Sequence, residues 1–129
     1  MGTLTLDASV LIGLLDAADT HHRSAVDAVE GADQARRGVV VPASAYSEAL
    51  VAFARAGRLR DAREAVASMG ITVAPLTATM AERAAELRAR HERLRLPDAI
   101  VLACARALDG ELLSYDQRLM QLADSEDAR

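Results

Sequence analysis

The sequence predicts an α/β fold: one mostly parallel sheet of four or five strands, flanked by helices in a three-layer α/β/α arrangement. Two observations lead to this prediction. Short apolar or β-branched segments alternate along the chain with longer segments that carry apolar residues at helical spacing. The chain also has 129 residues, which suits a single domain. Alternation of strands and helices favours a parallel sheet, because each crossover helix returns the chain to the same edge.

Four segments are predicted as strands because they are short, apolar and bounded by residues that favour turns. Pro42 and Pro75 end the second and third of these segments, since proline cannot donate a hydrogen bond to a neighbouring strand. The predicted strands are residues 3–7, 39–42, 71–75 and 111–116.

The remaining segments are predicted as helices from their apolar periodicity and end signals. Thr20 and Ser44 are placed to begin two helices, and Pro97 suits the first turn of another. Thr79 and Glu82 have the spacing of a capping box. We expect one domain over residues 1–123 and a polar C-terminal tail at 124–129. The predicted helices are residues 8–19, 20–36, 44–56, 59–69, 79–91, 97–108 and 117–123.

Charge and aromatic content limit the function classes. The net charge is −4, which is unlike a passive nucleic-acid-binding domain, and all 15 cationic residues are arginine. With two Tyr, one Phe and no Trp, the chain is not expected to form a base-stacking platform of the single-strand-binding kind. The arginines form two clusters, and each either attracts phosphate or simply solvates its helix. The clusters are Arg55, Arg58, Arg60 and Arg63, and Arg83, Arg88, Arg90, Arg93 and Arg95.

Cysteine and histidine offer no zinc site or disulfide. Cys104 is alone, and His21, His22 and His91 are too few and too badly spaced for a zinc motif, so we interpret them as surface residues. The longest apolar runs are far shorter than the roughly 20 residues of a membrane-spanning helix. The first residues lack the cationic region of a secretory signal. We therefore expect a cytoplasmic protein.

Four carboxylates are predicted to share one edge of the sheet. Asp7 ends the first strand, Glu48 lies about one turn into the helix after the second, and Asp116 follows the fourth. Asp98 begins the helix that leads into the fourth strand. A 12-residue helix spans roughly 18 Å and a five-residue strand roughly 16 Å, so Asp98 lies level with the strand ends. Ligands of parallel α/β sheets bind at this edge.

Each of these acids alone has an ordinary structural role. Asp7, Asp98 and Asp116 suit helix N-termini, and Glu48 suits a solvated helix face. Together, however, they repel: two carboxylates about 4 Å apart cost about 4 kcal/mol at an effective dielectric of 20. The chain has 19 acidic residues, and without these four the remaining 15 would equal the 15 arginines in number. The four acids of the site therefore account for the whole net charge of −4. Carboxylate oxygens suit Mg²⁺ or Mn²⁺, and the sequence predicts such a site.

The segments that hold these acids are LDASVLI at 6–12, Ser47–Glu48, LPDAIVLACAR at 96–106 and LLSYD at 112–116. Together and in this order they resemble the PIN-domain ribonucleases, specifically the VapC-type toxins of bacterial toxin–antitoxin pairs. The resemblance extends from Thr3 to about Leu122. It implies a Mg²⁺- or Mn²⁺-dependent endoribonuclease that acts as a toxin, is often a homodimer, and is inhibited by a cognate antitoxin covering the site.

The resemblance also assigns roles to individual residues. Ser114 would support the first aspartate by a hydrogen bond, and Ser9 fits the small polar position after that aspartate. Family members commonly add a short last strand, whereas this chain ends in the polar segment SEDAR, which leaves dimer and antitoxin contacts at that edge open. The catalytic and metal-binding acids implied by the resemblance are Asp7, Glu48, Asp98 and Asp116.

Other classes remain as alternatives. A PIN-like domain without nuclease activity could keep the acidic edge and only bind a partner. A phosphatase with an aspartyl nucleophile would need a second Asp where this chain has Ser9, and a receiver domain would need a lysine, which the chain lacks. Deoxyribonuclease activity is a close variant of the nuclease prediction, because the metals contact phosphate and do not sense the 2′-hydroxyl.

Overall fold

A computed structural model describes residues 2–129 and confirms the predicted α/β fold. Within these residues one sheet contains four strands, in the order β3-β2-β1-β4, and all neighbouring strands are parallel. The central pairings align Thr5 of β1 with Val40 of β2 and with Leu112 of β4. The strands are β1 (Leu4–Leu6), β2 (Val39–Pro42), β3 (Ile71–Ala74) and β4 (Glu111–Leu113).

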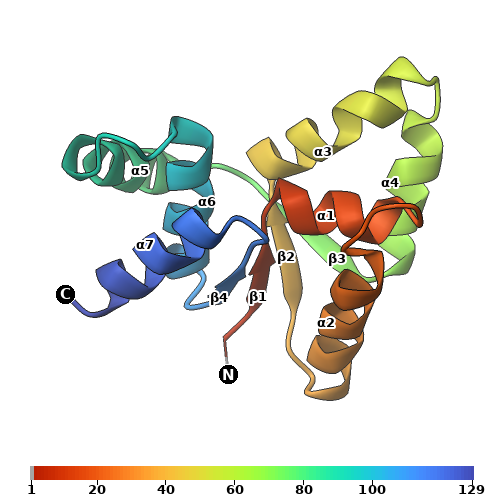
Figure 1. The fold of residues 1–129 in the computed structure, drawn as a ribbon, viewed down its shortest axis with the longest axis horizontal. Coiled ribbons are helices and arrows are strands. Elements are labelled where there is room, and N and C mark those ends of the chain that lie inside the picture. The colour runs from red at the N-terminus through yellow and green to blue at the C-terminus, as the bar shows by residue number, and fades with distance from the viewer. Residues whose placement is uncertain (1) are drawn as a thin grey trace.

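Helices cover both faces of this sheet and complete the three layers. Figure 1 shows α1, α2 and α4 on one side of the strands, and α5, α6 and α7 on the other. The helices are α1 (Ala8–Leu15), α2 (His22–Gln34), α3 (Ala43–Arg55), α4 (Leu59–Ser68), α5 (Ala78–Arg90), α6 (Leu96–Ala107) and α7 (Gln117–Asp127). No helix within residues 2–129 is long and apolar enough to cross a membrane.

The core explains why the strands are so uniformly apolar. All residues of β1 and β2 are buried, as expected for parallel strands covered on both faces. Leu6, Val10, Leu11 and Val41 are entirely excluded from solvent. Burying such a side chain contributes about 1.5–3 kcal/mol, so this layer holds β1 rigidly in the middle of the molecule.

The order of the strands creates a crevice at the carboxyl end of β1. The chain proceeds from β1 to β2 and β3 on one side, and β4 then pairs with β1 on the other side. The connections after β1 and β2 therefore diverge from the connection after β4. Such a switch in strand order is where ligands bind in open parallel sheets. Asp7, directly after β1, lies at this point.

The last predicted strand is shorter in the structure than expected. It ends at Leu113, and Ser114, Tyr115 and Asp116 form a loop. The backbone N–H groups of Tyr115 and Asp116 donate to serine hydroxyls and not to a neighbouring strand. These bonds to hydroxyl groups replace strand pairing, so the strand ends at Leu113.

Residues 124–129 were expected to form a polar tail, but α7 continues to Asp127. Glu126 is buried there, with its side chain 1% exposed, because it bonds Arg90 and His91 at the end of α5. Ion pairs thus hold this charged segment of α7 against the end of α5.

The start of α5 also differs from the prediction: Thr77 caps it by accepting from the Met80 N–H, in place of Thr79. Thr20 does not cap α2, which begins at His22.

Candidate active site

Asp7 is a buried carboxylate fixed by three donors. It is 7% exposed and caps α1, since its Oδ1 accepts from the Val10 N–H at 3.1 Å. Ser9 Oγ donates to the same oxygen at 2.6 Å. Ser114 Oγ donates to Oδ2, so the hydrogen bond expected between Ser114 and Asp7 is present. A buried carboxylate with both oxygens bonded has its orientation set before any ligand arrives.

The two serines also attach the loop after β4 to Asp7. Ser9 Oγ accepts from the Tyr115 N–H at 3.1 Å, and Ser114 Oγ accepts from the Asp116 N–H at 2.9 Å. Each hydroxyl thus donates to Asp7 and accepts from the loop. This arrangement couples the position of Asp116 to that of Asp7.

Asp116 caps α7. Its Oδ1 accepts from the backbone N–H groups of Arg118 at 2.9 Å and Leu119 at 3.3 Å. The residue is exposed, unlike Asp7. Both aspartates therefore have the helix-capping role that each could have alone, and both follow strands at the same edge of the sheet. Capping does not exclude a second role, because each cap uses only one carboxylate oxygen.

Asp98 lies in the first turn of α6 and interacts electrostatically with the other two aspartates. Its side chain is 24% exposed, and Arg95 Nε is 3.6 Å from its Oδ2. Burial raises the pKa of Asp98 above its ordinary value; Arg95 opposes this, and the charges of Asp116 and Asp7 add to it. The structure thus brings three of the four predicted acids close enough to repel.

Arginines surround the outer part of this acidic edge. Asp98 and Asp116 line an open cavity of about 650 Å³ together with Arg93, Arg95 and Arg118. Guanidinium groups suit phosphate oxygens, whereas the carboxylates repel them. The cavity therefore combines arginine side chains that could bind phosphate with two carboxylates, Asp98 and Asp116, whose repulsion a metal ion would reduce.

Glu48 is placed differently from the other three acids. It is exposed on α3 and lines a second groove of about 530 Å³ with Ile12, Asp16, Phe53 and Arg58, among others. Sequence reasoning placed Glu48 at the correct edge of the sheet, but it did not define which side of α3 the carboxylate occupies. Grouping of Glu48 with the three aspartates stays a prediction.

The donor types fit Mg²⁺ or Mn²⁺, although the side chains are not arranged as a ready coordination shell. Among residues 2–129, no three Asp, Glu, His or Cys side chains stand close enough together to hold an ion. Asp7, Asp98 and Asp116 nevertheless offer only carboxylate oxygens, the ligands that these ions prefer. Their repulsion, seen at Asp98, is what a divalent cation would relieve.

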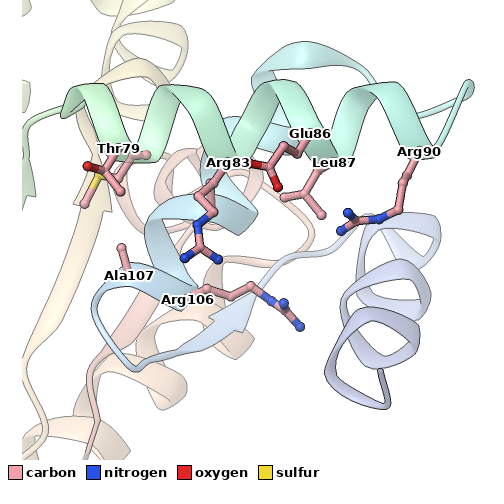
Figure 2. Close-up of a pocket in the computed structure, with 9 residues that line it drawn as sticks. Thr79, Arg83, Glu86, Leu87, Arg90, Arg106 and Ala107 are labelled. Atoms are coloured by element: carbon pink, nitrogen blue, oxygen red, sulfur yellow. The ribbon is translucent and has the colours of Figure 1, made fainter.

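A second arginine-lined groove lies away from these acids. It has a volume of about 330 Å³ between α5 and α6, and Figure 2 shows Arg83 reaching from α5 toward Arg106 of α6. Arg90 and Arg106 bond carboxylates of α7: Arg90 donates to Glu126 and Arg106 to Asp127, both at 2.7 Å. Arg90 of α5 and Arg106 of α6 therefore anchor α7, whereas Arg93 and Arg95, which follow α5, line the acidic cavity.

One feature of the site region was missed from the sequence. The rings of His21 and Tyr115 stack, with centroids 4.1 Å apart and an interplanar angle of 12°. His21 is exposed, as expected for a surface residue, but its ring also has an aromatic partner. The two residues are distant in sequence and belong to no motif, so no local signal could have paired them.

The three aspartates thus belong to elements that meet at the switch point of a parallel α/β/α domain, the place where such domains bind their ligands. The chain belongs to the PIN domain family, whose model matches residues 4–125. No curated protein matches the chain.

Solved structures of toxins share this fold. A toxin–antitoxin complex from Klebsiella pneumoniae matches with a TM-score of 0.73 and 26% identity, covering 89% of this chain and 88% of that one. VapC20 of Mycobacterium tuberculosis, a sarcin-ricin loop cleaving toxin, matches with a TM-score of 0.71 and 22% identity over 92% and 94%. VapBC2 of Rickettsia felis, bound to a DNA fragment from its promoter, matches with a TM-score of 0.75 and 10% identity, covering 93% of this chain and 92% of that one. The chain thus has the fold of VapC-type toxins.

Proposed function

We propose that this protein is the toxin of a toxin–antitoxin pair, a Mg²⁺- or Mn²⁺-dependent endoribonuclease that hydrolyses RNA phosphodiester bonds in the cytoplasm. The observation that carries the proposal is the carboxylate of Asp7, fixed by Ser9 and Ser114 at the switch point of a PIN-domain sheet. The charges of Asp7 and Asp116 both act on Asp98. Asp7 accepts three hydrogen bonds, which leaves its carboxylate oxygens with capacity for a further partner such as a metal ion.

Asp7, Asp98 and Asp116 would hold one or two divalent ions, with Glu48 contributing directly or through water. Such an ion supplies activation of a water nucleophile and neutralisation of charge on the phosphoryl group. The protein's own part is orientation. Ser9 and Ser114 keep both oxygens of Asp7 in place, and the caps of α1 and α7 keep two of the acids at the crevice.

We further propose that the arginines of the acidic cavity hold the substrate backbone. Arg93, Arg95 and Arg118 line the same cavity as Asp98 and Asp116, whereas the cluster at Arg55–Arg63 lies on α3, α4 and the turn between them. An RNA phosphate at the acidic edge meets repulsion from the carboxylates, and these guanidinium groups offset it. The arginines proposed to contact RNA are therefore Arg93 and Arg95 of the second cluster, together with Arg118.

The cognate antitoxin is proposed to bind the groove between α1 and α3. This groove combines apolar side chains, among them Ile12 and Phe53, with Glu48 at its edge, and Ile12 is 36% exposed. An antitoxin seated there would cover Glu48, and the Klebsiella relative was solved as a toxin–antitoxin complex. A homodimer is proposed on the resemblance to the family.

The test is cleavage of a structured RNA mixture by purified protein with Mg²⁺, with Mn²⁺ and with EDTA, alongside Asp98→Asn. Cleavage should require the metal and fall by at least about 100-fold in the variant. Asp27→Asn is the matched control, because Asp27 is an exposed aspartate of α2 paired with Arg23. A single-stranded DNA substrate in parallel separates ribonuclease from general nuclease activity.

Cleavage that persists in EDTA, or in Asp98→Asn at the wild-type rate, would contradict the proposed site. A folded protein that binds Mn²⁺ and an antitoxin but cuts no RNA would instead favour the PIN-like partner-binding domain without nuclease activity.

A further inference from the structure

His21 and Tyr115 form a stacked aromatic pair attached to the residues that position the site acids. Tyr115 lies between Ser114 and Asp116 in the chain, and its N–H donates to Ser9 Oγ, which itself donates to Asp7. The ring of His21 covers the ring of Tyr115 at a centroid distance of 4.1 Å. One hydrogen-bonded chain thus connects this pair to the buried carboxylate.

The Tyr115 ring and the backbone of His21 are both held in place. The Tyr115 hydroxyl donates to Ser24 Oγ at 3.0 Å, and Tyr115 packs against the hydrophobic core. The backbone N–H of His21 donates to Asp19 Oδ1 at 2.8 Å, and its carbonyl accepts from the Ala25 N–H at 2.9 Å. The His21 ring therefore extends from a fixed backbone and stacks on a fixed ring, which lowers the entropy that it loses when a ligand binds to it.

The pair has one covered side and one open side. Tyr115 is partly buried, while His21 is exposed, so the face of the imidazole opposite Tyr115 is accessible to solvent. An accessible aromatic face on a rigid support is the feature that binds unstacked nucleobases. The chain has only three Phe and Tyr residues in total, and one of them supports this face beside the acids.

We propose that His21, supported by Tyr115, stacks on a nucleobase of a single-stranded segment of the RNA substrate, next to the phosphate bound at the acidic edge. The inference rests on the proposed ribonuclease function and adds a base-binding subsite to it. Stacking accepts any base, so the subsite orders the substrate without reading its sequence. It also requires an unpaired nucleotide, which makes loops and single strands the preferred targets.

The test is a binding experiment on the Asp98→Asn protein, in which RNA is bound and not cut. The probe is a fluorescein-labelled single-stranded RNA, with a series of oligonucleotides that each carry one abasic position. His21→Ala should weaken binding of the intact RNA by about 5- to 100-fold, the usual loss for one stacked base. One abasic position should weaken binding to a similar extent.

The decisive readout is the combination of the two changes. His21→Ala should bind that abasic RNA no more weakly than it binds the intact RNA, because both changes remove the same contact. His21→Phe should restore binding and His21→Leu should not. Tyr115→Phe keeps the stack and loses only the bond to Ser24, so it should bind within about threefold of the parent protein.

A purely structural role for the pair predicts otherwise. The loss from His21→Ala would then be the same at every abasic position, or His21→Leu would bind as well as His21→Phe, and either result overturns the proposal. If the wild-type protein cleaves RNA and His21→Ala binds RNA as tightly as its parent, this inference is contradicted and the proposed function is not. Wild-type protein that neither binds nor cuts RNA removes both.

Discussion

At the scale of single residues, the serines beside Asp7 matter as much as the acid itself. Ser114 is 6% exposed and bonds the carboxylate oxygen Oδ2 from a position 107 residues away. Partners that orient a metal ligand typically contribute 10- to 100-fold to metal affinity or activity. We therefore expect the Ser114 hydroxyl to contribute to the proposed activity through the position of Asp7.

Ser114→Ala should lower RNA cleavage by about 10- to 100-fold and destabilise the fold by about 1–3 kcal/mol, since Asp7 Oδ2 loses its donor inside the protein. Cleavage rates at several Mg²⁺ concentrations and urea unfolding check the two effects. Ser68→Ala is the control, because Ser68 bonds only the Ala65 carbonyl on exposed α4. Wild-type cleavage by Ser114→Ala would mean that Asp7 needs no such support.

The positions of the aspartates were predictable from the sequence because each directly follows a strand or begins a helix. The boundary of an element fixes the place of its first residue. Glu48 lies in the interior of α3, where the direction of a side chain depends on how the helix packs. The stack of His21 on Tyr115 depends wholly on tertiary structure, and sequence reasoning excluded such a platform on composition alone.

At the scale of elements, the end of α7 is attached to α5 by charge. Glu126 accepts from Arg90 at 2.7 Å and pairs with His91 at 2.6 Å, while Arg129 lies 3.9 Å away. The hydrogen bonds from Arg90 and His91 hold the pKa of Glu126 at about 2. Because the carboxylate is favoured by folding, its contribution to stability is complete above the ordinary pKa of 4.5 and disappears as the pH falls toward 2.

Glu126→Gln should therefore lower the free energy of unfolding by about 1–3 kcal/mol at pH 7, and the difference from wild type should shrink between pH 4.5 and pH 2. Urea unfolding of both proteins at pH 7, 4 and 3 measures this. Asp124→Asn, an exposed change on the same helix, should behave as wild type. A difference that does not change with pH would show that Glu126 acts through packing and not through its charge.

The elements themselves were largely predictable, and two of the exceptions have a common cause. Within residues 2–129, the four strands and seven helices lie near their expected ranges, although α1 ends at Leu15 and not at residue 19. The end of α7 and the end of β4 also differ from the prediction. Glu126 finds its partners on α5, and the loop after β4 finds a hydroxyl partner at Ser9 in α1, so both boundaries depend on contacts with distant parts of the chain.

At the scale of the whole molecule, the acidic edge is a source of instability that a cation should remove. The pKa of Asp98 is raised chiefly by burial, and the charges of Asp116 and Asp7 add to this. An acid whose pKa is raised by folding costs stability at neutral pH. A divalent ion that binds only the folded state stabilises it in proportion to the logarithm of its concentration above Kd.

Mn²⁺ should therefore raise the melting temperature of the wild-type protein, by several degrees when it is about 100-fold above its Kd. Asp98→Asn should lose most of this increase, and its metal-free form should melt at or above the wild-type temperature, since a buried repelled charge is gone. Differential scanning calorimetry with MnCl₂ and with EDTA provides the measurement. An equal increase in both proteins would place the ion elsewhere.

The overall architecture was predictable as a class, but not the order of its strands. Alternating strands and helices require a parallel sheet with helices on both faces. Nothing in the local pattern states that β4 pairs with β1 and not with β3. That choice depends on which helices fit each face, and it is the choice that creates the crevice.

The pairing of β4 with β1 also sets the order in which the acidic edge is assembled during synthesis. Asp7 leaves the ribosome well before Asp98, Ser114 and Asp116, and Ser114 bonds Asp7 across 107 residues of sequence. A nascent polypeptide therefore carries the first aspartate without its partners until the segment that contains β4 has been made. The proposed nuclease activity, which needs all three aspartates, is thus delayed by the topology of the sheet until that segment has left the ribosome.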